Sequence, residues 1–249
     1  MLQAPSDDEL LLPYEVRILR GDYKEYLKVK RNNYLATTQA FPNLWESFQL
    51  LDEIWKREFD DLERLRETKQ MFPLILFLHA HSQFRVALDL GFSCCIGEAW
   101  NVLRSGIEST VHAHKVYREP HLLKVWIGKD DGPEQARAFK DVFEHDKKNS
   151  LFPSQYGLDK LHAYWSQFSE FGTHTTVSAL GRRFVEDKTT TDVNWKLQYF
   201  ETETDRLALF LFSLLSASRL MEKAFFDCFD TRLTLDPQLG EMRAQFEQL

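Results

Sequence analysis

The sequence predicts a mainly α-helical protein: a multi-helix bundle with one small β-hairpin near residues 182–200. Three observations lead to this fold class. Only 10 glycines and 8 prolines occur among 249 residues, too few for the many turns of an all-β fold. Apolar residues recur at steps of three and four over long stretches, which is the period of an amphipathic helix. Aromatic residues make up 14 % of the chain, and large rings favour thick layers between helices, because each buried ring removes much area from water.

Four helices are expected in the first half of the chain, from the spacing of apolar residues and from the positions of proline and glycine. Residues 1–20 look irregular, with a short extended piece over 15–19. Pro73 suits the first turn of a helix and Gly91 suits its end, so these two residues bound one expected helix. The helices expected in this half cover residues 22–37, 43–69, 72–90 and 92–118.

The second half contains the expected hairpin between further helices. Val193, Trp195 and Leu197 alternate with polar residues, which is the period of a half-buried strand. The segment RRFVE at 182–186 is the expected partner strand, joined through DKTTTD at 187–192. The helices expected around the hairpin cover residues 121–127, 133–145, 158–180, 201–229 and the last ten residues.

We expect a single helical domain over residues 1–249. A chain of this length buries about 70 to 75 % of its unfolded surface and needs no disulfide or metal for stability. No internal repeat, low-complexity tract or linker interrupts the sequence. The turn GKDDGP at 128–133 is the best candidate for a weak boundary, but the apolar helices on both sides are expected to share one core.

Charge and cysteine content limit where the protein acts. The net charge is −7, with Lys and Arg spread along the chain, which argues against a broad DNA-binding or anionic-membrane surface. The three cysteines, Cys94, Cys95 and Cys228, do not form the pattern of a secreted disulfide framework. The start MLQAPSDDELLL lacks the features of a signal peptide, and the longest apolar runs fall short of the roughly 20 residues that span a membrane. We therefore expect a cytoplasmic protein.

The expected helix over 92–118 carries the residues best suited to chemistry. Arg104, Glu108 and His112 are spaced by four, so their side chains share one face. If this face lines a cleft, Arg104 binds an anion while Glu108 or His112 transfers protons, and Asn101 on the same row binds the ligand. The alternative is an exposed face with intrahelical ion pairs, each worth only about 0.2 to 0.5 kcal/mol.

Two other segments supply candidate residues. Arg85 lies on the polar row of the preceding helix, and the short connection makes the two helices antiparallel neighbours. We expect Arg85 to face Glu108 and to bind ligand. Ser169 is a ligand-binding candidate and His174 a catalytic candidate, because both lie where a helix meets Gly172. The alternative is a polar helix break whose hydroxyls bind backbone groups.

Metal and cofactor sites are not indicated by any complete pattern. Glu108 and His112 place two kinds of metal ligand on one helix face, but no full ligand set accompanies them, and the adjacent pair Cys94 and Cys95 lacks the C-x-x-C spacing. The chain contains no nucleophile elbow, phosphate loop or Rossmann glycine fingerprint. We therefore assign no metal ligand and expect no cofactor.

Two stretches resemble uncharacterised bacterial helical proteins related to the HEPN group. They are AWNVLRSGIEST at 99–110 and YWSQFSEFGTHTT at 164–176, and the resemblance covers about 72–180. It implies a helical bundle, often dimeric, and some members are ribonucleases in toxin or antiphage systems. The ribonuclease members carry Arg, four to six residues, then His on one helix. Here seven residues separate Arg104 from His112, so the chain departs from that motif.

These observations leave open whether the protein is an enzyme. The leading hypothesis is a helical protein that acts through self-association or a protein partner in a bacterial regulatory or defence context. The alternative is a HEPN-like hydrolase acting on RNA or nucleotide, in which Arg104, Glu108, His112 and His174 converge. A metal-dependent helical enzyme is the third hypothesis.

Overall fold

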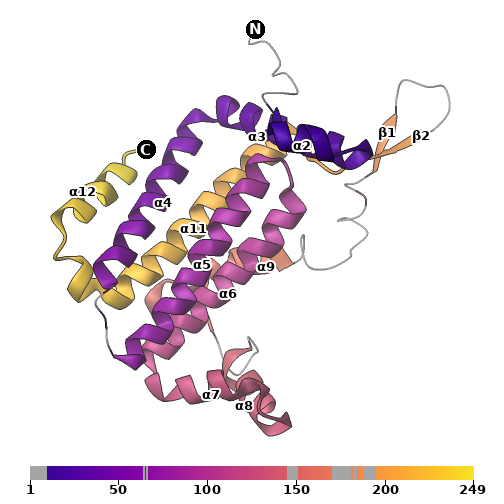
Figure 1. Cartoon of the computed structure of the whole chain (residues 1–249). Helices are drawn as coiled ribbons and strands as arrows, with labels where there is room; N and C mark the ends of the chain where they lie inside the picture. The colour runs from indigo at the N-terminus through magenta and orange to yellow at the C-terminus, as the bar shows by residue number, and fades with distance from the viewer. Residues whose placement is uncertain are drawn as a thin grey trace.

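Four long helices form the body of the protein in a computed structural model. The structure describes residues 10–63, 65, 67–144, 151–169, 181, 184–187 and 194–249. The four helices run side by side along one direction (Figure 1), and they are α4 (Pro42–Leu62), α5 (Thr68–Phe92), α6 (Ile96–Arg118) and α11 (Thr204–Leu233). The mainly α-helical fold class predicted from the sequence is therefore confirmed.

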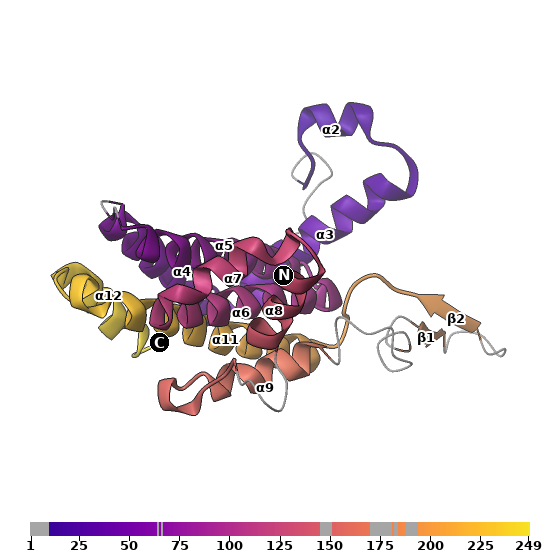
Figure 2. The ribbon, with the colours of Figure 1, turned by 90° about the horizontal axis from the view of Figure 1, so that it is seen from below.

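The N-terminal region is helical where the sequence predicts an irregular segment. Helices α2 (Pro13–Ile18) and α3 (Gly21–Ala40) project from one end of the bundle (Figure 2). The extended piece expected over 15–19 is wrong. Proline suits a first helical position because its φ is already fixed. Arg31 of α3 binds Glu15 of α2 with N–O distances of 2.6 and 2.9 Å, a contact that local sequence cannot reveal.

Helix α5 is longer at both ends than its proline and glycine suggest. It begins at Thr68, so Pro73 lies inside the helix, and it continues past Gly91 to Phe92. Near a helix start a proline removes only one hydrogen bond. Gly91 serves close packing rather than termination, because a Cβ there would lie 2.7 Å from Cε1 of Phe210 on α11.

Helices α5 and α6 form the antiparallel hairpin that the sequence predicts. The connection is only three residues long, and Cys94 within it has a φ of 63°. A Cβ on Gly106 would lie 3.2 Å from Cβ of Gln83 and 3.0 Å from Cε of Met221. The missing side chain at Gly106 therefore lets α6 approach both α5 and α11.

Shorter elements surround the bundle. Helices α7 and α8 lie at the end of the bundle opposite the strands, and α12 lies outside α4 (Figure 1). A third peripheral helix, α9, packs against α6 and α11. The bounds of these elements are η1 (Pro120–Leu122), α7 (Leu123–Ile127), η2 (Gly128–Asp130), α8 (Pro133–Phe143), η3 (Ser154–Tyr156), α9 (Asp159–Phe168) and α12 (Pro237–Phe246).

Two short strands project from the same end of the bundle as the N-terminal helices, away from the bundle itself (Figure 2). Strand β1 (Phe184–Asp187) pairs antiparallel with β2 (Asn194–Leu197), with Phe184 opposite Leu197. The segment between them lies outside the described residues. At four residues each, the strands leave the body of the fold entirely helical.

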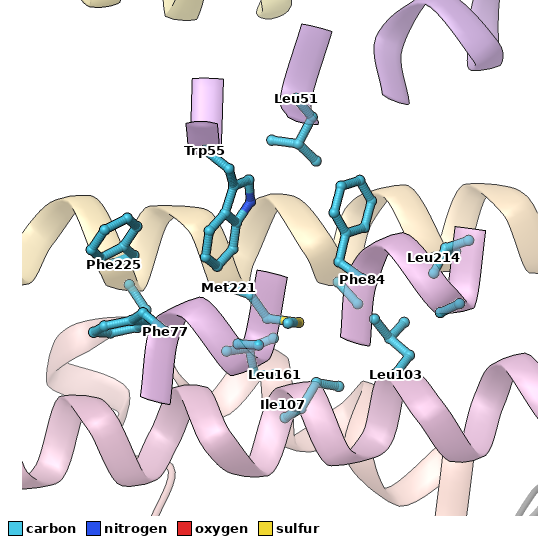
Figure 3. Close-up of a cluster of buried hydrophobic side chains, with 14 of the residues drawn as sticks. Leu51, Trp55, Phe77, Phe84, Leu103, Ile107, Leu161, Leu214, Met221 and Phe225 are labelled. Carbon is cyan, nitrogen blue, oxygen red and sulfur yellow. The ribbon is translucent and has the colours of Figure 1, made fainter. Parts of the chain in front are cut away.

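The core lies between the four long helices and is rich in aromatic rings (Figure 3). Trp55 of α4 and Phe77 of α5 both pack against Phe225 of α11, with ring centres 5.5 and 4.8 Å apart. Leu161 brings α9 into the same cluster. Other members are Leu51, Phe84, Leu103, Ile107, Leu214 and Met221. Ring packing across several helices thus fixes how each one is rotated and which of its polar residues face outward.

Candidate functional site

The candidate residue Arg104 lies at the centre of a polar contact between α6 and α9. Its Nε donates a hydrogen bond of 2.7 Å to Oγ of Ser169, and Nη2 lies 2.9 Å from Oε1 of Glu108. Its guanidinium carbon lies 4.9 Å from the centre of the Trp165 ring, within cation–π range. The guanidinium is therefore held on two edges and on one face.

The other three residues close this contact into a network. Trp165 Nε1 donates a hydrogen bond of 3.0 Å to Oε1 of Glu108, the oxygen that Arg104 also contacts. Ser169 Oγ donates to the backbone carbonyl of Trp165 at 2.7 Å. We call Arg104, Glu108, Trp165 and Ser169 the Arg104 network.

The Arg104 network is only partly open to solvent. The side chains of Arg104 and Glu108 are 25 % and 38 % exposed. The geometry allows a guanidinium to meet an anion from the solvent side, although the neighbouring carboxylate cancels its charge. Equally, the four side chains tie α9 to α6. The structure brings the candidate residues Arg104, Glu108 and Ser169 together, while their role as a site stays a prediction.

His112 occupies a different environment from the Arg104 network. Trp126 Nε1 donates to Nδ1 of His112 at 3.4 Å, so the proton is on Nε2, which donates to the carbonyl of Phe143 at 3.1 Å. Burial lowers the pKa of His112, which keeps the ring neutral. Both nitrogens join α6 to α7 and α8, so neither is available to the Arg104 network, and the expected convergence does not include His112.

Arg85 does not face Glu108, and that expected pair is wrong. Its Nε and Nη2 bind the two carboxylate oxygens of Asp52 on α4 at 2.7 and 2.9 Å. The reason is helix rotation: α5 turns Ala80 and Gln83 toward Gly106 of α6, which leaves Arg85 on the side beside α4. Arg85 still lines a pocket of ≈ 360 Å³ together with Asp52, so its ligand-binding role stays a prediction.

Asp52 also binds His81, a residue that the sequence reasoning missed. His81 Nε2 lies 2.7 Å from Oδ1 of Asp52, and the His81 ring is buried against Trp55. Burial raises the pKa of Asp52, but hydrogen bonds from His81 and Arg85 outweigh it and hold the pKa well below its usual range. The four-residue spacing of His81 and Arg85 was the available signal.

Asn101 and His174 are the two remaining candidate residues. Asn101 is exposed, and its Nδ2 donates to the carbonyl of Gly97 in its own helix at 3.3 Å. His174 lies outside the described residues. Neither observation tests the roles predicted for them.

Buried charge on the other side of the bundle was also missed. Glu58 of α4 is completely buried, and Arg243 of α12 lies 3.3 Å from its Oε1 while also contacting Glu222 of α11. Burial raises the pKa of Glu58 well above its usual range. Its position on the apolar row of α4, three residues after Trp55, was a signal in the sequence that this carboxylate faces inward.

Within the described ranges, no group of three or more His, Cys, Asp or Glu side chains is arranged to hold a metal ion. No helix in that part of the chain is both long enough and apolar enough to cross a membrane. Comparison with protein-family models, curated proteins and solved structures gives no match to this chain.

Proposed function

We propose that the protein acts by self-association through the outward side of α5, in a bacterial regulatory or defence context. The observation that carries this proposal is a row of exposed apolar side chains on a central helix. Met71, Ile75, Leu78 and Val86 are 37 %, 55 %, 53 % and 45 % exposed. Grouped exposed apolar residues are typical of interaction surfaces in proteins of this size.

The spacing of this surface suits a second helix. We define the α5 face as the outward row of that helix, made up of Met71, Ile75, Leu78, Ser82, Arg85, Val86 and Asp89. Apart from Val86, these positions follow steps of four and three residues, which form the seam of a two-helix contact. An α-helix from another chain can pack along such a seam.

Charge favours a second copy of this chain as the occupant. In a two-fold dimer the same surface meets itself, so an uncompensated charge would repel its counterpart. On the α5 face Arg85 is already paired with Asp52, and Asp89 lies 2.7 Å from Lys30. The chain as a whole carries a net charge of −7, so a charge-neutral face is the favourable place for two copies to meet.

The test is the oligomeric state of the purified protein. We expect a concentration-dependent dimer in sedimentation equilibrium, and an Ile75→Lys/Leu78→Lys variant that dissociates with a Kd about 100-fold higher, equivalent to about 2.7 kcal/mol. The matched control is Leu209→Lys/Phe212→Lys, which charges the exposed apolar pair of α11 and should leave the dimer intact. A parent protein that stays monomeric at about 100 µM, or an α5 variant that dimerises like the control, contradicts the proposal.

A HEPN-like hydrolase acting on RNA or nucleotide is the second proposal. One observation favours it: the direct contact of Arg104 with Ser169 joins the two stretches that resemble the HEPN group. In this proposal Arg104 binds phosphate and His174 transfers the proton, because His112 is engaged elsewhere. The parent should cleave single-stranded RNA, while Arg104→Ala and His174→Ala should not. Absence of cleavage by the parent ends this alternative.

A metal-dependent helical enzyme, the third hypothesis, has no ligand group among the described residues to support it. Its test is elemental analysis of the purified protein, which should show stoichiometric metal if the hypothesis holds.

A further inference from the structure

A pocket of ≈ 690 Å³ lies between α3 and the segment that leads into α11. Helix α3 contributes Asp22, Glu25 and Tyr26, and the opposite side is formed by residues 198–204. We call this cavity the α3 pocket. Its volume is within the range of about 300 to 1,000 Å³ that is typical of small-molecule sites.

Aromatic rings form one wall of the α3 pocket. The Tyr26 ring stacks on Phe200 with centres 5.2 Å apart, and it meets Tyr199 edge-to-face at 5.9 Å. Tyr199 remains 70 % exposed, so much of its ring is accessible to a bound molecule. Ring faces attract organic cations within about 6 Å.

The charged residues that line the α3 pocket in the described part of the chain are all acidic. None of these lining residues is Lys, Arg or His, and four are carboxylates: Asp22, Glu25, Glu201 and Glu203. Glu25 is paired with Lys28 at 3.3 Å. Glu201 accepts hydrogen bonds from two backbone amides and lies 4.0 Å from Arg206.

Two of these carboxylates have no partner within the described part of the chain. Asp22 begins α3, whereas Glu203 immediately precedes α11, so the pocket brings together negative charges from distant parts of the sequence. The described carboxylates do not form a group of three that could hold a metal ion. Separated carboxylates can pair with two positive charges of one molecule, and the aromatic rings beside them can contact an apolar chain between those charges.

We infer that the α3 pocket binds a small organic cation of the aliphatic di- and polyamine class. Its ammonium groups pair with Asp22 and Glu203, and its methylene chain lies against Tyr199 and Phe200. A simple anion is disfavoured by the acidic lining, and a neutral molecule leaves both carboxylates unpaired. This inference is independent of the α5 face, which belongs to a different helix.

The test uses spermidine as the probe and isothermal titration calorimetry at low ionic strength. The full chain should bind it saturably, and an Asp22→Asn/Glu203→Gln variant should bind at least about tenfold more weakly, because both carboxylates that pair with the ammonium groups are then neutral amides. The control variant Glu46→Gln/Glu134→Gln removes the same amount of charge from exposed residues outside the pocket. It should bind like the parent.

Two further measurements separate pocket binding from general attraction to an acidic protein. A neutral aliphatic diol of similar length should not bind, and Tyr199→Ala should weaken spermidine binding several-fold without changing the circular dichroism spectrum. Absence of saturable binding to the parent overturns the inference. Equal affinities of the pocket variant and the control variant also overturn it, because the attraction would then come from net charge alone.

Discussion

Arg243 of the C-terminal helix α12 lies 3.3 Å from Glu58, a carboxylate of α4 with no exposed surface. The same guanidinium contacts Glu222 of α11 and lies 4.0 Å from the centre of the Phe226 ring. One cation from the end of the chain thus compensates two buried carboxylates on different helices. This contact explains how a helix of only ten residues is anchored to the bundle.

Removing this cation should destabilise the protein strongly. Arg243→Met removes the guanidinium from the buried carboxyl groups of Glu58 and Glu222, and removing one partner of a buried, hydrogen-bonded pair costs about 3 to 5 kcal/mol. The free energy of unfolding from urea denaturation measures the effect. Arg219→Met is the control, because its pair with Glu247 is half exposed and should contribute below about 1 kcal/mol. Equal losses in the two variants would contradict the prediction.

His114 should make stability depend on pH. The ring is buried against Tyr156, and burial lowers its pKa from 6.5 to about 4. Between these two values the unfolded chain binds a proton that the folded protein does not, so stability falls as the pH falls through this window. At 1.36 kcal/mol per pKa unit the loss is about 3 kcal/mol. His114→Leu should remove this part of the pH dependence, measured as the difference between the two stability curves from pH 7 to 4. Parallel curves would refute the prediction.

Two glycine substitutions should have opposite effects. Alanine is favoured over glycine inside a helix by about 1 kcal/mol. Gly240→Ala in α12 should gain about this amount, because no atom lies within 4 Å of the new Cβ. Gly91→Ala should instead destabilise by about 1 to 3 kcal/mol through overpacking, because its Cβ would lie 2.7 Å from Cε1 of Phe210. Thermal unfolding of both variants gives the sign, and a stabilised Gly91→Ala variant would disprove the close contact.

The Arg104 network should show energetic coupling between its helices. Arg104 and Ser169 are joined by a hydrogen bond of 2.7 Å, and a double-mutant cycle with Arg104→Ala and Ser169→Ala should give a coupling energy of about 1 kcal/mol. Asn101→Ala serves as the control, since its exposed side chain donates to Gly97 of its own helix and its loss should change stability by less than about 0.5 kcal/mol. Additive losses at Arg104 and Ser169 would show that the contact is not energetically significant.

The parts of the fold that could be predicted from the sequence depend on patterns among residues close together in the chain. The apolar period of three and four residues predicts the helix over 43–69, and the structure has α4 at Pro42–Leu62. The same period and a short connection predict the α5–α6 hairpin. Such predictions work because helix formation depends on residues three and four apart. The exact ends of the helices were harder to predict. Gly91, for example, does not end α5, because its lack of a side chain allows close packing against α11.

Within the candidate site, the spacing of residues along α6 predicted which side chains share a face of the helix. It did not predict which neighbouring helices those side chains would contact. Arg104 and Glu108 do pair, as their four-residue separation predicts. His112, four residues after Glu108, instead bonds to Trp126 and Phe143. All three share one face of α6. Different segments cover successive turns of that face, however, so each side chain meets a different partner.

The sequence alone therefore determined that the chain is helical, where most of its helices lie and which polar residues share a helix face, because these properties arise from contacts within a few residues. Only the tertiary structure decided the partner of each polar side chain. Arg85 meets Asp52 rather than Glu108, and Arg243 meets Glu58, which is 185 residues away in the sequence. These pairings depend on how each helix is rotated and which helix lies beside it. Close packing of large side chains throughout the core sets that rotation.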